Sequence, residues 1–223
     1  MRSVDKGSSP RNYKNYRDAR PDLVKRIGRY CSYCEMGVNN LLAVEHIIPV
    51  ANGGNKYNWD NFLLACTYCN SCKKDRNQGR EGYFWPDRDV TMYKFTYSQK
   101  KGVIPHPELT EKEREIALAT INLTSLNRFV DSRNRIDARW KSRNEVWGIA
   151  KVSLQNWKLL GSDQMLSQIC LTAKSSGHFS IWMEVFKNEA LVKEGIIKQF
   201  AGTNLPRASK EDMPSLKPGG PDG

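Results

Sequence analysis

No stretch of this sequence approaches the roughly 20 consecutive apolar residues that a membrane-spanning helix needs. The first residues, MRSVDKGSSPRNYK, contain no apolar segment of the kind that a secretory signal carries. No segment repeats along the chain. Hydrophobic residues make up 39% of the chain and the mean hydropathy is -0.64, so we expect a soluble cytoplasmic protein with no membrane partner.

Acidic side chains are in short supply. The 223 residues contain 35 Lys and Arg against 24 Asp and Glu, which gives a formal net charge of +11. Residues 1–105 hold 18 basic and 10 acidic side chains, whereas residues 106–223 hold 17 and 14. A basic half suits a polyanionic partner such as a nucleic acid. Charge alone also fits a surface that only keeps the protein soluble.

The cysteines are few but clustered. Five of the six lie within residues 31–72, and four of these form the pairs Cys31-x-x-Cys34 and Cys66-x-x-Cys69. Disulfides are disfavoured in a reducing cytoplasm, whereas two such turns can present four thiolates to one tetrahedral Zn²⁺. We therefore predict a structural zinc site, with Cys72 as an alternative fourth ligand in place of Cys69. Buried thiols without a metal are the competing interpretation.

A second pattern lies between and beside these cysteine pairs. It consists of the segments EHIIP (45–49), NGG (52–54), DNFLLAC (60–66) and CTYCN (66–70), followed by Lys74. Together these segments resemble the signature of the HNH, or ββα-metal, endonucleases over about 45 residues. The third residue of the signature is Asn70 here rather than His, which is a variant found in that family.

The resemblance implies a metal-dependent enzyme that hydrolyses phosphodiester bonds. It makes His46 the base that takes a proton from water, a role that an imidazole can fill near neutral pH. Glu45 and Asn70 would supply oxygen ligands to Mg²⁺ or Mn²⁺, and Asn61 would brace the loop that carries His46. The catalytic set is thus His46, Asn61 and Asn70. The residues assigned to nucleic-acid contact are Lys73, Lys74 and Arg76.

Each of these residues also has a plainer interpretation. A histidine on an apolar strand is commonly a core residue, Asn70 could cap a helix, and Glu45 could pair with a Lys or Arg. Neighbouring residues on a strand point to opposite faces. Glu45 and His46 can therefore serve one site only if the backbone twists or bulges there. The remaining histidines, His106 and His178, are assigned structural roles.

After residue 105 the pattern becomes helical. Thr110 and Glu113 form a capping box, and apolar residues keep helical spacing as far as Gly148. Within this stretch the segment 128–143 is rich in arginine, which suits either contact with phosphates or a solvated helix face. Further helices are predicted over 151–160, 162–176 and 178–200.

The sequence therefore predicts an α+β protein with three parts. Residues 1–105 form a small zinc-stapled ββα-metal nuclease unit, and residues 106–202 form an all-α docking and positioning unit. Residues 203–223 hold four Pro and three Gly in a tail that we expect to be disordered.

A narrower resemblance covers more of the chain. The opening RSVDKG, the segment RYCSYCE and the later GHFSIWMEVF are similar to the PtuB-type HNH component of Septu antiphage systems. That component acts beside an ABC-type ATPase, PtuA. The resemblance implies an antiphage nuclease, with DNA as the expected substrate and the helical half as the part on which the ATPase docks. Exposed apolar residues of 179–186 would then form the docking surface; otherwise they are the core face of an amphipathic helix.

Two other classes of function remain open. A non-catalytic zinc-stapled module would bind nucleic acid without cutting it. An interaction protein with a purely structural zinc site would show no affinity for nucleic acid. Neither alternative needs Glu45, His46, Asn61 and Asn70 together, so their joint presence favours the nuclease.

Overall fold

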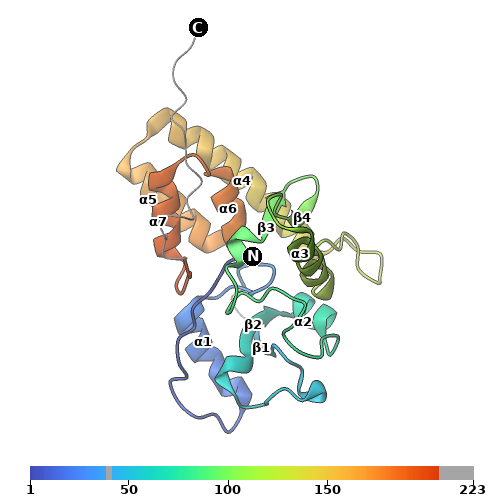
Figure 1. Cartoon of the computed structure of the whole chain (residues 1–223). Coiled ribbons are helices and arrows are strands. Elements are labelled where there is room, and N and C mark those ends of the chain that lie inside the picture. Colours follow the sequence, from blue (N-terminus) through green and yellow to red (C-terminus); the bar gives the residue numbers. More distant parts are fainter. Residues whose placement is uncertain (39–41, 206–223) are drawn as a thin grey trace.

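Seven α-helices and two antiparallel hairpins make up the part of the chain that the computed structural model describes, residues 1–38 and 42–205. The predicted α+β class is confirmed (Figure 1). The helices are α1 (Arg20–Ile27), α2 (Thr67–Lys73), α3 (Glu111–Leu123), α4 (Ala138–Leu160), α5 (Asp163–Ser176), α6 (Phe179–Val185) and α7 (Ala190–Gln199). The strands are β1 (Leu42–His46), β2 (Phe62–Cys66), β3 (Phe95–Ser98) and β4 (Gly102–Pro105).

The hairpin of β1 and β2 carries the sequence motif. β1 pairs with β2 in an unbroken antiparallel register, from Leu42 opposite Cys66 to His46 opposite Phe62. All five residues of β2 are buried, which fits the continuous apolar sequence FLLAC. The chain passes directly from β2 into α2, since the Cys66 sulfur accepts a hydrogen bond from the Cys69 amide and caps the helix. Two strands and one helix thus form a ββα unit.

Helix α1 packs against both strands of this unit. Its inward face carries Leu23 and Ile27, both fully buried. Gly28 follows with a φ of +79°, a conformation that glycine adopts without strain, and the helix ends there. The turn toward the first cysteine pair can therefore begin immediately.

Helix α3 begins as predicted but ends much earlier. Thr110 and Glu113 make both hydrogen bonds of the capping box. The helix stops at Leu123 instead of continuing to Gly148, and Ser125, two residues further on, has a φ of +49°. The prediction of one long helix is wrong, because apolar spacing persists through a segment whose backbone turns away.

A loop of residues 124–137 separates α3 from α4. Its middle is closed by an isolated bridge between Val130 and Ile136, and both side chains are exposed. Asp137 then starts α4, because its carboxylate accepts a hydrogen bond from the Arg139 amide. α4 runs without interruption through Gly148, so the helix predicted over 151–160 is its second half.

The segment 178–200 contains two helices rather than one. α6 packs against α4 and β3, and its apolar side chains Phe179, Ile181 and Trp182 are at most 1% exposed, as is Phe186 just beyond the helix. The docking surface suggested for 179–186 is therefore wrong. These side chains are core residues, which is the alternative interpretation of an amphipathic helix.

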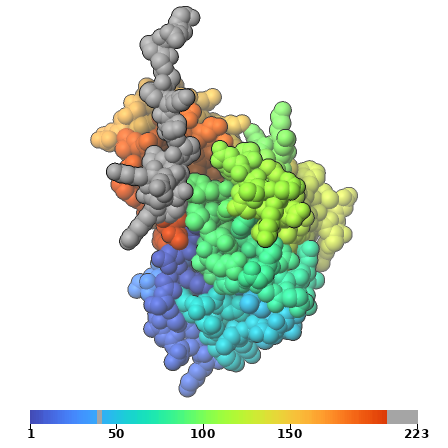
Figure 2. All heavy atoms as spheres, in the orientation of Figure 1, coloured from blue at the N-terminus to red at the C-terminus, as the bar shows by residue number. Residues whose placement is uncertain are grey.

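The first residues of the chain lie where the ββα unit and the helical half meet. Val4 pairs with Thr203, and the buried Arg2 guanidinium donates to the carbonyls of Ile27 and Ala201. Figure 2 shows the two ends of this arrangement, with the blue and cyan segments at one end and the orange and red segments at the other. The division at residue 105 remains a prediction.

Two further predictions concern the termini and the membrane. The predicted tail begins at Thr203, which the structure places in a bridge, while residues 206–223 lie outside the described residues. No helix in residues 1–38 and 42–205 is long and apolar enough to cross a membrane.

Candidate active site and metal centre

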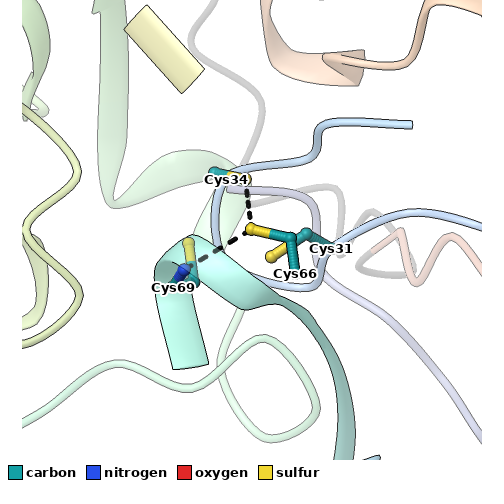
Figure 3. A group of neighbouring side chains, drawn as sticks. All are labelled: Cys31, Cys34, Cys66 and Cys69. Atoms are coloured by element: carbon teal, nitrogen blue, oxygen red, sulfur yellow. Dashed lines mark hydrogen bonds between the residues drawn. The ribbon is translucent and has the colours of Figure 1, made fainter. Parts of the chain in front are cut away.

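The four predicted zinc ligands converge in the interior (Figure 3). The sulfurs of Cys31, Cys34, Cys66 and Cys69 all lie within 4.8 Å of one another, and those of Cys34 and Cys66 are 3.7 Å apart. A tetrahedral zinc with Zn–S bonds of about 2.3 Å would separate its sulfurs by roughly 3.8 Å. The cluster therefore fits a structural zinc site.

Local backbone structure explains this convergence. Cys31 and Cys34 occupy a turn closed by a hydrogen bond from the Glu35 amide to the Cys31 carbonyl. The Ser32 amide of that turn donates to the Leu64 carbonyl, so the first cysteine pair is docked on β2. Burial raises the pKa of the Cys69 thiol, so that zinc binding, which needs the thiolate, must expel its proton.

Cys72 is outside the group of four. It is half-buried on the last turn of α2, while Cys69 one turn earlier is fully buried within the cluster. The structure therefore favours Cys69 over Cys72 as the fourth ligand.

His46 is the last residue of β1, and its ring is held on three sides. Its Nε2 lies 3.1 Å from the carbonyl oxygen of Lys56. Tyr16 packs beside the ring with 4.7 Å between centroids, and Phe62 meets it edge to face at 5.4 Å. A carbonyl oxygen can only accept a hydrogen bond, so Nε2 carries the proton of a neutral ring. Nδ1 is then the nitrogen that can accept a proton.

The environment of His46 favours its neutral form. Burial is the main cause that lowers its pKa below the usual value, and the positive charges of Lys73 and Lys56 act in the same direction. The hydrogen bond to the Lys56 carbonyl opposes them without reversing the shift. The imidazole is consequently unprotonated at neutral pH, as a general base must be.

Asn61 lies buried directly behind the segment that follows His46. Its amide oxygen accepts a hydrogen bond from the Ile48 amide at 2.8 Å. Its amide nitrogen donates to the carbonyls of Ile48 at 2.9 Å and Asn55 at 3.1 Å. Gly54 completes this packing, because a Cβ there would lie 1.9 Å from the Ile48 carbonyl oxygen. One side chain thus ties together both ends of the turn after β1.

Glu45 and Lys73 contact each other, which differs from the assignments of Glu45 as a metal ligand and Lys73 as a nucleic-acid contact. The Lys73 ammonium lies 2.7 Å from a Glu45 carboxylate oxygen and also donates to the His46 carbonyl at 3.0 Å. Glu45 is 5% exposed and Lys73 is fully buried. The structure follows the alternative in which Glu45 pairs with a lysine. Lys73 presents no charge to a nucleic acid, so that assignment is corrected.

This ion pair also bears on the expected Mg²⁺ or Mn²⁺ site. β1 keeps its regular register at Glu45 and His46, without a bulge that would turn both side chains to one face. The Glu45 carboxylate faces an ammonium instead of an open coordination position. Glu45 and Asn70 therefore do not form an oxygen site that fits the ion in this arrangement. Within the described residues, the four cysteines form the one group of three or more His, Cys, Asp and Glu ligands.

The other predicted residues lie on or just after α2. Asn70 is half-buried within the helix, where Cys66 is the cap, so the alternative of Asn70 as an N-cap is wrong. Lys74 is exposed with a φ of +47° directly after the helix. Arg76 is exposed, but its guanidinium donates to the carbonyls of Asn122 and Leu123 at the end of α3.

Three residues at the site are not identified from the sequence. Tyr16 belongs to a basic N-terminal segment without periodicity, and no motif connects it with His46. Asn77 donates to the Ile47 carbonyl at 2.9 Å and supports the same turn as Asn61. Arg139 contacts the sulfur of Cys69 from α4. Its place in an arginine-rich stretch was the one available signal.

Comparison with known proteins identifies the central part of this site. Residues 31–76, about a fifth of the chain, match the family model described as HNH endonuclease. The predicted resemblance to that family is thereby confirmed for this segment. No curated protein matches the chain, and the narrower resemblance to PtuB-type components is not confirmed.

Proposed function

We propose that this chain hydrolyses phosphodiester bonds in nucleic acid through its HNH endonuclease domain at residues 31–76. The observation that carries the proposal is the setting of His46 at the end of β1. Its Nε2 is occupied by the Lys56 carbonyl, its pKa is lowered mainly by burial, and its Nδ1 can accept a proton.

The proposed reaction is attack by an activated water. The water oxygen forms a bond to phosphorus, while the bond from phosphorus to one sugar oxygen breaks. His46 accepts the proton of the attacking water at Nδ1, and the departing sugar oxygen takes a proton from solvent. A positioned general base contributes about 10²–10⁴ to such a rate.

Two other residues support the base and the substrate in this proposal. Asn61 holds the turn after β1 through three hydrogen bonds, so the backbone that carries His46 keeps its position. Lys74 is exposed beside α2 and suits contact with a phosphate. Arg76 also suits phosphate contact, although its guanidinium first has to leave the carbonyls of α3.

Mg²⁺ or Mn²⁺ remains the catalytic ion that we expect. Such an ion stabilises charge that develops on a phosphate. Asn70 and Glu45 stay its proposed ligands by resemblance, although the contact of Glu45 with Lys73 argues against a preformed site.

The finer parts of the proposal concern substrate and partner. We propose DNA as the substrate, and an antiphage role beside an ABC-type ATPase that docks on the helical half, residues 106–202. The support is the resemblance to PtuB-type components and the basic charge of residues 1–105. The alternative is a zinc-stapled module that binds nucleic acid or a protein without cutting.

A plasmid assay with two histidine variants tests the proposal. Full-length protein would be incubated with supercoiled DNA, and in parallel with RNA, in EDTA, Mg²⁺ or Mn²⁺. His46→Ala should lower cleavage by about 10²–10⁴, or roughly 2.7–5.5 kcal/mol of barrier. His106→Ala is the matched control, because His106 lies after β4 and contacts its own neighbour Glu108.

The outcomes of this assay separate the alternatives. Metal-dependent cleavage by wild-type protein that is lost in His46→Ala, with unchanged circular dichroism, supports the enzyme. Binding without cleavage by wild-type protein supports the non-catalytic module. Wild-type rates in a folded His46→Ala protein would refute the role of the base.

A further inference from the structure

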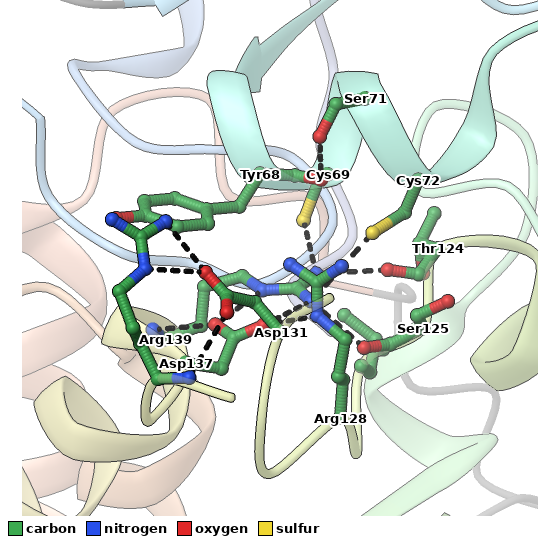
Figure 4. Close-up of polar contacts among 12 residues, drawn as sticks. Tyr68, Cys69, Ser71, Cys72, Thr124, Ser125, Arg128, Asp131, Asp137 and Arg139 are labelled. Carbon is green, nitrogen blue, oxygen red and sulfur yellow. Dashed lines mark hydrogen bonds and ion pairs between the residues drawn. The ribbon is translucent and has the colours of Figure 1, made fainter. Parts of the chain in front are cut away.

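Arg139 of the helical half contacts the cysteine cluster (Figure 4). Arg139 lies in the first turn of α4 and is fully buried. Its Nη1 lies 3.3 Å from the Cys69 sulfur, and its Nη2 lies 3.9 Å from the sulfur of Cys72. An arginine from the helical half thus bridges the ligand in α2 and the neighbouring free thiol.

Hydrogen bonds from all three nitrogens hold the Arg139 guanidinium in place. Nη1 also donates to the Thr124 carbonyl at 2.8 Å, and Nη2 to the Ser125 carbonyl at 2.9 Å. Nε and Nη2 both donate to the carboxylate of Asp137, at 3.0 and 2.8 Å. All three nitrogens, which together carry five N–H groups, therefore have partners. The contact with sulfur is part of a set geometry and not one of several rotamers.

The charges explain why an arginine belongs there. Four thiolates around one Zn²⁺ carry a net charge of minus two, and burying such a charge without compensation is costly. Arg139 brings a positive charge and an N–H donor to one of the thiolates. Asp137 does not cancel it, because the same carboxylate also accepts from Arg128 at 2.7 Å. The ion-pair network therefore leaves positive charge to face the sulfurs.

We propose that Arg139 is a positioning residue of the zinc centre, which stabilises the metal-bound thiolate of Cys69 and so makes α4 and the loop 124–137 part of that centre. Zinc binding then orders the start of α4, and the docked α4 strengthens zinc binding to the same extent. The helical half is therefore part of the zinc centre, because its Arg139 contacts a thiolate that binds the metal.

Release of zinc from the full chain tests this proposal independently of any nuclease activity. Zinc-loaded protein would be mixed with a chelating dye, and the competition would give the zinc affinity. Arg139→Gln removes the positive charge and most of the N–H donors of the guanidinium. Zinc affinity should fall about 10–100-fold, which is the range typical when an outer contact of a metal ligand is lost. Arg139→Lys keeps the positive charge but lacks the planar set of N–H donors. Its zinc affinity should therefore lie between those of wild type and Arg139→Gln.

Arg128→Gln is the matched control. It removes a partner of the same Asp137, whereas the contacts with the sulfurs of Cys69 and Cys72 belong to Arg139. Zinc affinity should fall clearly less than in Arg139→Gln, because Asp137 then offsets more of the Arg139 charge while the contact of Arg139 with Cys69 is kept. An equal loss in Arg128→Gln and Arg139→Gln, or no loss in Arg139→Gln, would overturn the proposal.

A second measurement uses wild-type protein only, in case Arg139→Gln does not fold. Hydrogen exchange would be compared with zinc bound and with zinc removed by chelator. Exchange should accelerate in residues 124–143, while α7, which packs against α5 and carries none of the four clustered cysteines, should change much less. Unchanged protection of 124–143 after zinc removal would contradict the coupling.

Discussion

Replacing Asn61 tests how the turn after β1 is held. In Asn61→Ala the three hydrogen bonds to Ile48 and Asn55 are lost, and their backbone groups stay in a half-buried turn. At about 0.5–1.5 kcal/mol for each bond, the free energy of unfolding should fall by about 3 kcal/mol. For a chain of this size about 1 kcal/mol corresponds to 2–4 °C, so the Tm should drop by roughly 6–12 °C.

Asn61→Asp sharpens this test. The aspartate can still accept from the Ile48 amide but cannot donate, and its charge would face the carbonyls of Ile48 and Asn55. It should therefore destabilise at least as much as alanine, although its shape is nearly that of asparagine.

The assay combines calorimetry with cleavage at a temperature where all variants are folded. Asn58→Ala is the control, because the exposed Asn58 side chain caps the short 3-10 helix Trp59–Asn61 by accepting from the Asp60 amide, while its backbone carbonyl, which accepts from Asn61, is kept. Cleavage by both Asn61 variants should fall because His46 loses its support, while Asn58→Ala should stay near wild type. A Tm and a cleavage rate for Asn61→Ala equal to wild type would refute this account.

Three further predictions use other features of the structure. The pKa of His46 is lowered, mainly by burial, so cleavage should rise with pH below about 6.5 and reach its plateau by neutral pH; a rate that keeps rising well above pH 7 would assign the base elsewhere. Lys73→Met leaves the buried Glu45 carboxylate without its partner and should destabilise by about 3–5 kcal/mol in urea unfolding, whereas an unchanged midpoint would mean that Glu45 finds another cation. A fragment of residues 1–105 keeps the cluster and the ββα unit but loses Arg139, so it should bind zinc more weakly than the full chain in the dye assay; equal affinity would speak for an independent nuclease unit.

The sequence predicts those parts of the site that depend on short spacing. The two-residue spacing in each CxxC turn places both of its thiolates on one side of the turn. The apolar run FLLAC indicates the strand that leads into α2. The roles of His46 and Asn61 follow from the resemblance to the HNH family, which depends on the pattern of their neighbours in sequence. These features depend on residues close in sequence.

The features that the sequence does not reveal depend on partners far apart or on which face is covered. Alternation along β1 indicates that Glu45 and His46 face opposite sides, yet it does not reveal that Lys73 lies opposite Glu45. An amphipathic pattern over 178–200 shows an apolar face but not that α4 and β3 cover it. Helical spacing also continued through the loop 124–137, since its exposed apolar residues Val130 and Ile136 imitate a helix face.

The distance along the chain between Cys69 and Arg139 has a consequence for synthesis. The contact joins residues 70 positions apart, and a ribosome adds about 5–20 residues per second. All four zinc-binding thiols therefore emerge from the ribosome roughly 4–14 s before the arginine that faces them. During that interval the nascent ββα unit has to capture zinc with its thiolates uncompensated, or keep its cysteines reduced until α4 arrives. We expect the cellular supply of free zinc to matter most for this protein while it is still being translated.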